Sequence, residues 1–268
     1  MTTPPRLTDR PALARNRARV DPTALYLHEE AILEVQERLA LVNRRFTAPA
    51  IVTPFADLWQ NFLPDARIVT DDEVLDLQPG AHDLVIHALS LHWADDPVGQ
   101  LVQCRRALKP DGLMIALTFG GQTLADLRAA LAEAEAQVTG GLSPRVLPMA
   151  EIRDLGALLQ RAGFALPVAD SFNRRVSHRD GLHLMRDLRA MGEGNALAGR
   201  LRHFTRRDVL LRAASALPTD AEGRVVSDFE VICLTGWAPH ESQQKPLRPG
   251  SAMARLEDAL KAATKEGS

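Results

Sequence analysis

The first 79 residues of this 268-residue sequence contain no glycine, since the first one is Gly80. A nucleotide-type cofactor in an α/β fold is normally held at a glycine-rich turn, where the backbone approaches the ligand closely and a helix begins behind it. No segment before residue 80 can supply that turn. The Gly-x-Ser-x-Gly elbow, the Gly-Lys-Ser/Thr phosphate loop and paired-cysteine metal motifs are also absent.

Cysteine, net charge and long apolar runs are scarce as well. Cys104 and Cys233 lie far apart and match no ligand spacing, which indicates a reducing compartment. The net charge of −2 gives no general attraction to nucleic acid, and no apolar run reaches the roughly 18 residues needed to span a bilayer. We expect a cytoplasmic protein, or a matrix protein in a eukaryote, with no membrane span and no nucleic-acid partner.

The N-terminus is rich in arginine but has no apolar core of the kind found in signal peptides. Residues 1–20 contain five arginines. This composition is compatible with a transit peptide, and a basic surface arm is the favoured interpretation.

The rest of the sequence alternates short apolar strands with helices, which favours a three-layer α/β sandwich. Only one strand-helix-strand passage fits before residue 83. Because one crossover takes roughly 30 residues, about one βα unit is missing. Strands are predicted near residues 51–52, 66–69, 83–88, 113–118, 168–176 and 228–235, and helices over 22–43, 55–62, 97–108, 122–138, 151–162, 183–190, 208–216 and 256–263.

Two segments follow the carboxyl ends of predicted parallel strands, where ligands bind in open α/β sheets. His92 and Trp93 are candidates for lining a pocket, although a tryptophan that only packs a loop is equally compatible with the pattern. Gly120 and Gly121 would let a ligand or a neighbouring segment approach the backbone, and a simple tight turn is slightly favoured.

The histidines predict no metal site. Three of them recur every five residues, but odd spacing on a strand places the middle one on the opposite face: His82, His87 and His92. A two-histidine, one-carboxylate iron set can be written from distant residues, and such a set arises easily by chance in a chain with eight histidines: His178 and Asp180 with His203 or His240.

The segment after the last predicted strand is dense in hydrogen-bonding side chains and contains three prolines. A polar loop laid over a pocket or a partner surface is favoured over a plain surface tail. Its candidate residues are Trp237, His240, Glu241, Ser242 and Gln243.

Several motifs together resemble the methyltransferase-like complex I assembly factor 5 family, alphaproteobacterial type, and more distantly the malonyl-carrier-protein methyltransferases. The resemblance extends from about residue 82 to 260 and is weaker over the N-terminal arm and first helix. It implies a class I S-adenosylmethionine (SAM) methyltransferase fold, Rossmann-like and truncated in its first βα units. The motifs are Ser90-Leu91-His92-Trp93 and the segments 108–112, 119–124, 154–164, 191–195 and 236–252.

The expected organisation is an N-terminal arm and helix over 1–46, followed by a methyltransferase-like domain over 47–268. Within that domain we expect a helical insertion at about 178–217 and a polar tail at 236–252.

SAM is the cofactor that the resemblance implies, but the glycine-rich family segment is replaced here by residues 50–57. Pro54 and Phe55 add bulk and remove a backbone donor at that point. The positions that match the family's cofactor site are Asp72, Glu73, Ser90, Leu91, His92 and Trp93. We assign a substrate- or partner-facing role to Gly120, Gly121, Glu193, Asn195 and the tail residues named above, with no catalytic residue and no metal.

The expected function is that of an assembly factor or pseudo-enzyme with a degenerate cofactor site, acting on a protein partner such as a complex I subunit. The alternative is an active methyltransferase or an arginine-hydroxylase-like modifier. An active enzyme would have His92, Trp93 and Gly120 in a SAM-sized pocket. A pseudo-enzyme would have that volume filled by Phe55, Leu58 or Trp59. A missing unit supplied by another chain would give an oligomer through the sheet edge.

Overall fold

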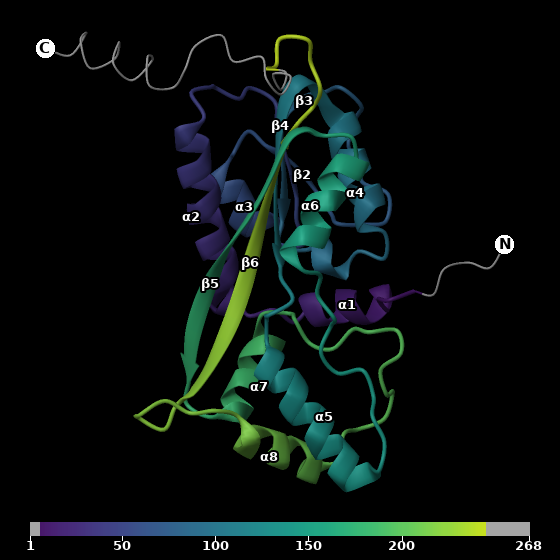
Figure 1. Cartoon of the computed structure of the whole chain (residues 1–268), viewed down its shortest axis with the longest axis vertical. Helices are drawn as coiled ribbons and strands as arrows, with labels where there is room; N and C mark the ends of the chain where they lie inside the picture. Colours follow the sequence, from purple (N-terminus) through teal and green to yellow (C-terminus); the bar gives the residue numbers. More distant parts are fainter. Residues whose placement is uncertain (1–5, 245–268) are drawn as a thin grey trace, which may run out of the picture.

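The computed structural model describes residues 6–244, in which six strands form one sheet with the order β2-β1-β3-β4-β6-β5 (Figure 1). The strands β1 to β4 run parallel, and β6 is antiparallel to both β4 and β5. The bounds are Pro49–Val52 (β1), Arg67–Val69 (β2), His82–Ala88 (β3), Leu108–Phe119 (β4), Ala165–His178 (β5) and Val225–Trp237 (β6).

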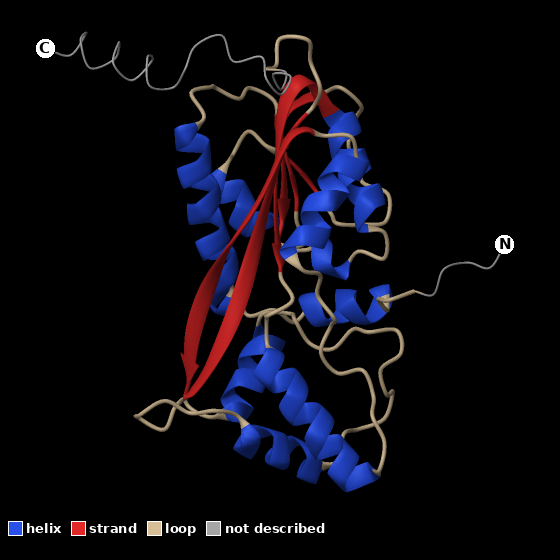
Figure 2. Ribbon diagram, in the orientation of Figure 1, coloured by secondary structure: helices blue, strands red, loops and turns tan. Residues whose placement is uncertain are grey.

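Helices cover both faces of this sheet, which confirms the three-layer sandwich (Figure 2). The helices α2 (Tyr26–Leu41) and α3 (Ala56–Phe62) lie on one face, and α4 (Pro97–Ala107) and α6 (Ile152–Arg161) lie on the other. Neighbouring strand residues serve opposite cores: Ile86 packs on the α2 side and Val85 on the α4 side. The central strands are therefore apolar throughout, as strands covered on both faces should be.

Three further helices lie beyond the carboxyl ends of the parallel strands, and we call them the helical cap. They are α5 (Ala125–Thr139), α7 (Gly181–Ala190) and α8 (Arg207–Ala216). Gly181 lets α7 start directly against α8, because a Cβ there would lie 2.7 Å from the backbone of Ala214. The predicted insertion at 178–217 supplies α7 and α8, whereas α5 comes from the connection after β4. The proposed domain limits remain a prediction.

The N-terminal half contains one βαβ passage before β3, formed by β1, α3 and β2, as the spacing predicted. Asp21 caps a short 3₁₀ turn (η1, Pro22–Ala24) by accepting a hydrogen bond from Thr23 N, so α2 begins later than predicted. β4 begins at Leu108, earlier than the strand predicted near 113–118, and Asp111 within it has a positive φ of 61°. The predicted helix at 256–263 lies outside the described residues.

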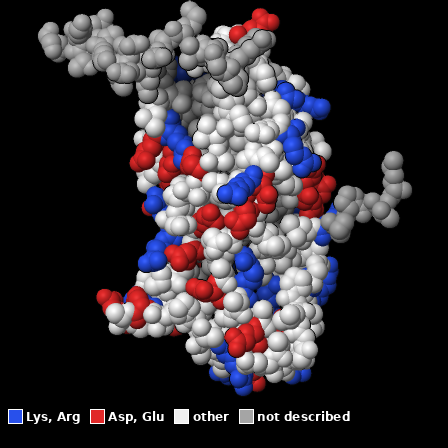
Figure 3. Space-filling view, in the orientation of Figure 1, with Lys and Arg blue, Asp and Glu red and all other residues white. Residues whose placement is uncertain are grey.

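Charge is mixed over the surface. Figure 3 shows acidic and basic side chains interspersed on the face in view, in keeping with the net charge of −2. Within residues 6–244, no helix is both long and apolar enough to cross a membrane.

Candidate functional site

The turn after β1 has its backbone donors engaged within the chain. Thr53 N donates to Val69 O at 2.9 Å, and Phe55 N donates to Thr53 Oγ1 at 3.2 Å. Pro54, between them, has no N–H. This turn sits where an open α/β sheet receives the negative groups of a nucleotide cofactor, yet none of its three residues, Thr53 to Phe55, has a free N–H.

The acidic segment after β2 is also bound by another part of the chain. The residue involved is Asp71, which directly precedes the predicted cofactor positions Asp72 and Glu73. Asp71 is only 7% exposed, and Arg17 Nη1 lies 2.7 Å from its Oδ1 and 3.0 Å from its Oδ2. Arg10 donates to the Asp71 carbonyl oxygen at 2.6 Å. Burial alone would raise the pKa of Asp71, but Arg17 and Arg10 outweigh it and bring the pKa below its ordinary value.

The predicted positions in that segment, Asp72 and Glu73, are at the surface. Their side chains are 67% and 57% exposed, with Arg10 3.5 Å from Asp72 and Arg6 3.9 Å from Glu73. An acid at the end of the strand beside β1 is the usual partner of a cofactor ribose. In this chain the buried acid at that place is Asp71, and it is bound to arginines.

Both arginines on Asp71 come from α1 (Arg10–Arg17), so residues 6–17 form a packed segment rather than a surface arm. Leu13 is 1% exposed. Thr8 Oγ1 donates to Trp93 O at 2.9 Å, and Thr8 N donates to Asp95 Oδ1 at 2.9 Å. The basic-arm interpretation was wrong because this short helix buries Leu13 and pairs two of its arginines, Arg10 and Arg17, with Asp71, while Arg15 stays exposed. The segment covers the loops that follow β2 and β3.

The loop after β3 is buried beneath this segment. Ser90, Leu91 and Trp93 are 1–3% exposed, and the His92 side chain is 1% exposed. Leu91–Trp93 forms a 3₁₀ turn, η2. Of these four residues, Trp93 lines a cavity, and its indole donates a hydrogen bond to Glu193.

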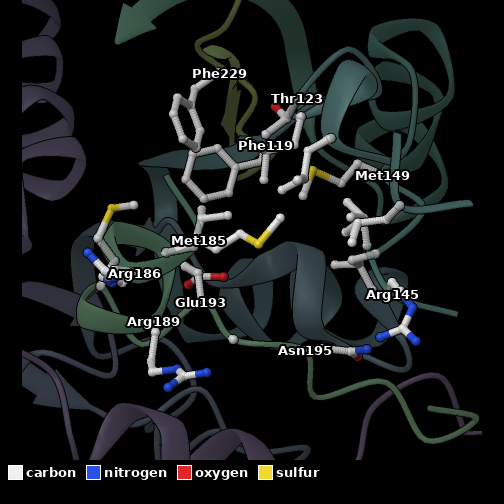
Figure 4. A pocket seen from close by; sticks show the side chains of 18 of the residues that line it. Phe119, Thr123, Arg145, Met149, Met185, Arg186, Arg189, Glu193, Asn195 and Phe229 are labelled. Atoms are coloured by element: carbon white, nitrogen blue, oxygen red, sulfur yellow. The ribbon is translucent and has the colours of Figure 1, made fainter. Parts of the chain in front are cut away.

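A cavity of about 380 Å³ opens between the helical cap, the carboxyl end of β4 and the amino-terminal half of β6, which is antiparallel to β4. Its walls are mostly apolar, with Phe119, Phe229, Met149 and Met185 facing one another across it (Figure 4). The polar groups are few: Thr123, Arg145, Arg186, Arg189, Glu193 and Asn195. An apolar cavity with a few converging polar groups is the usual form of a small-ligand or side-chain site.

Glu193 is the acidic group of this cavity. Its Oε2 accepts a hydrogen bond from Trp93 Nε1 at 2.8 Å and lies 3.4 Å from His92 Nε2. Burial would raise the pKa of Glu193, but contacts with His92, Arg17 and Trp93 more than offset this and lower the pKa. The carboxylate is therefore held ionised at neutral pH and aimed by an indole that comes from the β3 loop.

The turn that carries Glu193 follows α7. Gly192 has a φ of 81° and ends the helix in the left-handed conformation, and Glu193 N donates to Leu188 O. Asn195 Nδ2 donates to Pro144 O at 2.9 Å, which ties this turn to the segment before α6. The cavity thus brings together two of the predicted partner-facing residues, Glu193 and Asn195, with the predicted cofactor residue Trp93.

Comparison with known families and solved structures gives this geometry a context. A family model described as a methyltransferase domain matches residues 33–116. A putative methyltransferase of Bacillus halodurans has 12% identity and a TM-score of 0.50, covering 78% of this chain and 99% of that one. The YcgJ protein of Bacillus subtilis has 9% identity and a TM-score of 0.50, covering 79% and 99%. This chain has a class I methyltransferase fold.

Curated relatives are much more similar in sequence. The protein named arginine-hydroxylase NDUFAF5, mitochondrial, of Danio rerio is 37% identical over 202 residues, covering 74% of this chain and 63% of that protein. The human protein of that name is 38% identical over 193 residues, covering 71% and 56%. A malonyl-[acyl-carrier protein] O-methyltransferase of Laribacter hongkongensis is 33% identical over 186 residues, covering 69% and 61%.

These matches confirm the predicted resemblance to the methyltransferase-like assembly factors and, more distantly, to the malonyl-carrier-protein methyltransferases. The chain spans 56–63% of the length of these three relatives.

Within this methyltransferase fold, the aromatic residues of α3 pack behind β1. Trp59 is fully buried and donates from Nε1 to His28 Nδ1 at 3.2 Å, while the Phe55 ring lies 4.8 Å from the His28 ring. Leu58 packs against the same core, on the α2 side of the sheet. These side chains therefore pack in the core on the α2 side, and the side chain that contacts the buried acid after β2, Asp71, is Arg17 of α1.

The glycine pair after β4 accommodates protein rather than opening onto the cavity. A Cβ at Gly120 would lie 2.5 Å from Glu230 Oε2, and one at Gly121 would collide with Glu151. Glu230 Oε2 also accepts a hydrogen bond from Gln122 N at 3.0 Å. Thr123 N also donates to Gly120 O at 3.0 Å, so the tight turn that the sequence slightly favoured is present, and neighbouring segments approach the glycine pair closely as well.

The described part of the polar tail lies at the opposite end of the sheet from the cavity (Figure 1). Gln243 Nε2 donates to Asp111 Oδ1 at 2.9 Å, and His240 Nδ1 lies 2.7 Å from Ser242 Oγ. Trp237 ends β6, and Glu241 is exposed. The described part of the tail, up to residue 244, therefore does not cover this cavity, and the assignment of the tail as a partner surface remains a prediction.

The histidines of the β3 region do not converge on one point. His87 Nε2 contacts Gln100 Oε1 at 3.2 Å, whereas His82 Nδ1 contacts Ala48 O at 3.2 Å. The distant iron set is not assembled either: Asp180 caps α7 by accepting from His183 N, and His203 contacts Phe204 O.

Proposed function

We propose that this chain is an assembly factor or pseudo-enzyme that acts on a protein partner and has a degenerate SAM site. The observation that carries the proposal is the ion pair between Arg17 and Asp71, because it places a guanidinium of the chain itself on the acid best placed to bind a ribose. The turn of Thr53 to Phe55, with its donors engaged or missing, supports the same conclusion.

The cavity supports the partner-binding half of the proposal. Its apolar wall and single deep carboxylate suit a long side chain with a cationic or hydrogen-donating end, presented by a polypeptide. Arg145, Arg186 and Arg189 also line it and can donate hydrogen bonds to backbone carbonyl groups of a docked segment. From the resemblance, we infer that the partner is a respiratory complex I subunit. We infer that the two proteins bind in the cytoplasm, or in the mitochondrial matrix of a eukaryote.

A second candidate is an active modifier of a protein side chain, either a methyltransferase or a hydroxylase of the kind named among the relatives. It is favoured by Glu193, which lines a cavity of side-chain size together with Trp93 and is contacted by Trp93 and His92 from the loop after β3. Such a geometry can orient a substrate group, and orientation supplies much of the rate of a transfer reaction.

Isothermal titration calorimetry of the purified full chain with SAM and S-adenosylhomocysteine, up to millimolar ligand, tests the proposal. We expect no saturable heat from protein whose circular dichroism shows it to be folded. Binding at micromolar ligand, worth about 8 kcal/mol, would overturn the degenerate-site proposal and favour the active modifier.

An Arg17→Met variant is the matched control, because it removes the guanidinium 2.7 Å from Asp71 while leaving Arg10, 3.5 Å from Asp71 Oδ2, and the Thr53 to Phe55 turn unchanged. No binding by either protein would support a site that is degenerate at both places. Binding by the variant alone would show that the α1 arginine by itself closes the site.

Oligomerisation through the sheet edge also remains a prediction. The edge strand β2 is three residues long, and Arg67 on it pairs with Asp76 at 2.7 Å. Short, charged edges usually disfavour pairing with another sheet.

A further inference from the structure

A cluster of two histidines and one carboxylate lies where β5 meets α7. One donor atom from each of His178, His183 and Asp187 lies within 4.8 Å of the other two. His178 Nδ1 is 2.6 Å from Asp187 Oδ2, and His183 Nδ1 is 3.1 Å from that oxygen. Donor atoms around one tetrahedral zinc ion, at about 2.1 Å each, are themselves about 3.4 Å apart, so the side chains need to separate by less than about 1 Å to admit an ion.

The local structure fixes each of these side chains. His183 and Asp187 are one helical turn apart on α7 and therefore on one face. Asp180 caps that helix at His183 N, with a distance of 2.7 Å. His178, the last residue of β5, has a side chain only 1% exposed. The cluster thus has one buried, rigid donor and two donors on a capped helix.

The remaining nitrogen of His178 has the partner expected of a metal ligand. Its Nε2 lies 2.8 Å from Ser227 Oγ, in a residue that is 6% exposed. A histidine that binds a metal through one nitrogen normally has its other nitrogen hydrogen-bonded, which fixes the ring orientation. Nδ1 of His178 is thereby aimed at the cluster.

Solvent can reach the cluster from one side. The side chains of His183 and Asp187 are 41% and 27% exposed, so an ion has an entry path and a position for water. Two imidazole nitrogens and one carboxylate oxygen suit borderline divalent ions such as Zn²⁺, Co²⁺ or Ni²⁺ better than Mg²⁺ or Ca²⁺.

We infer that His178, His183 and Asp187 form a binding site for one borderline divalent metal ion of the Zn²⁺ class, which ties the end of β5 to α7. The other face of α7 supplies Met185, Arg186 and Arg189 to the cavity. The ion is therefore a structural clamp behind the cavity wall rather than a group that contacts a cavity ligand. No transfer step is assigned to it.

The test is a calorimetric titration of tag-free, chelator-treated full-length protein with ZnCl₂, repeated with CoCl₂ while the visible absorption of Co²⁺ is recorded. We expect one ion per chain and absorption bands of a low-coordinate nitrogen and oxygen site. His183→Ala and Asp187→Ala should each abolish saturable binding. Ser227→Ala should weaken it by about 10–100-fold, the usual cost of losing an outer-shell partner.

His203→Ala is the matched control, since His203 is an exposed histidine outside the cluster. It should bind zinc like the unaltered chain, and circular dichroism should show that all four variants remain folded. Absence of saturable binding by the unaltered chain, or equal binding by His183→Ala, would overturn the inference and leave the cluster as a hydrogen-bonded network of Asp187 with two histidines.

Discussion

The two places where this fold could receive a ligand differ in how their polar groups are used. After β1 and β2, the backbone donors and the buried acid bind other parts of the chain, and Arg17 forms an ion pair with that acid, Asp71. Under the helical cap, the corresponding acid, Glu193, is oriented by Trp93 but still lines a cavity of about 380 Å³. We call the first the closed side and the second the open side.

The difference shows which part of a methyltransferase fold can change independently. The sheet order and the buried central strands depend on apolar packing, which a cofactor does not supply. Because Arg17 of α1 pairs with Asp71 after β2, the buried carboxylate at this edge of the sheet has a charged partner without a ligand. The open side is built from α5, α7 and the β4 end, and therefore does not depend on the lost unit.

The largest expected effect comes from breaking the closed side. Asp71→Ala leaves Arg17, whose side chain is 10% exposed, buried without its partner. Loss of one member of a buried ion pair typically costs about 3–5 kcal/mol of the free energy of unfolding. Urea denaturation followed by circular dichroism measures this change.

Asp72→Ala is the control, because the Asp72 side chain is 67% exposed and its ion pair with Arg10 spans 3.5 Å. An exposed pair is worth about 0–1 kcal/mol. Equal losses for Asp71→Ala and Asp72→Ala would show that the closed side is not held by its buried acid.

A second prediction concerns acid sensitivity on the closed side. Burial lowers the pKa of His87 to about 4, although Asp71 and Gln100 act in the opposite direction. An unfolded histidine titrates near pH 6.5, so below that pH the unfolded chain binds a proton that the folded chain excludes. Stability is then fully present above about pH 6.5 and falls toward pH 4, by about 1.4 kcal/mol per pH unit for this residue.

His87→Gln should remove that part of the slope, and unfolding free energies measured at intervals from pH 7 to 4.5 would show it. His240→Gln, an exposed histidine of the tail, should leave the slope unchanged. A slope that His87→Gln does not alter would mean that His87 can be protonated in the folded chain and that its surroundings are more open than described.

The sequence predicted most of the fold because its signals are local. The helix start at Pro97, the apolar run at 83–88 and the single crossover before it all reappear in the structure. The pairing of Asp71 with Arg17 was missed because 54 residues separate them and each alone looks like an ordinary surface charge. The available signal was the position of Asp71 directly after the short strand at 66–69.

The candidate site was predicted in part for the same reason. Trp93, Glu193 and Asn195 were named from motifs, and the structure brings them to one cavity. Their convergence needs α7 to pack against β5 and β6, which no local pattern encodes. Gly120 and the tail residues were named by position along the chain, and tertiary packing places them elsewhere.

The smallest expected effect concerns the end of the sheet farthest from both sides. Gln243→Ala removes hydrogen bonds from Nε2 to Asp111 Oδ1 at 2.9 Å and to Ala238 O at 2.8 Å. Net contributions of such bonds are about 0.5–1.5 kcal/mol, and the tail's exposure places the loss at the low end. The same variant tests where a partner binds, because none of the hydrogen bonds that Gln243 makes within residues 6–244 reaches the cavity lining. Gln243→Ala should weaken co-purification with the partner only if the tail is a docking surface.

Glu193→Gln should weaken co-purification if the cavity is the docking surface. The two variants therefore separate the open side from the tail as the place where a partner binds.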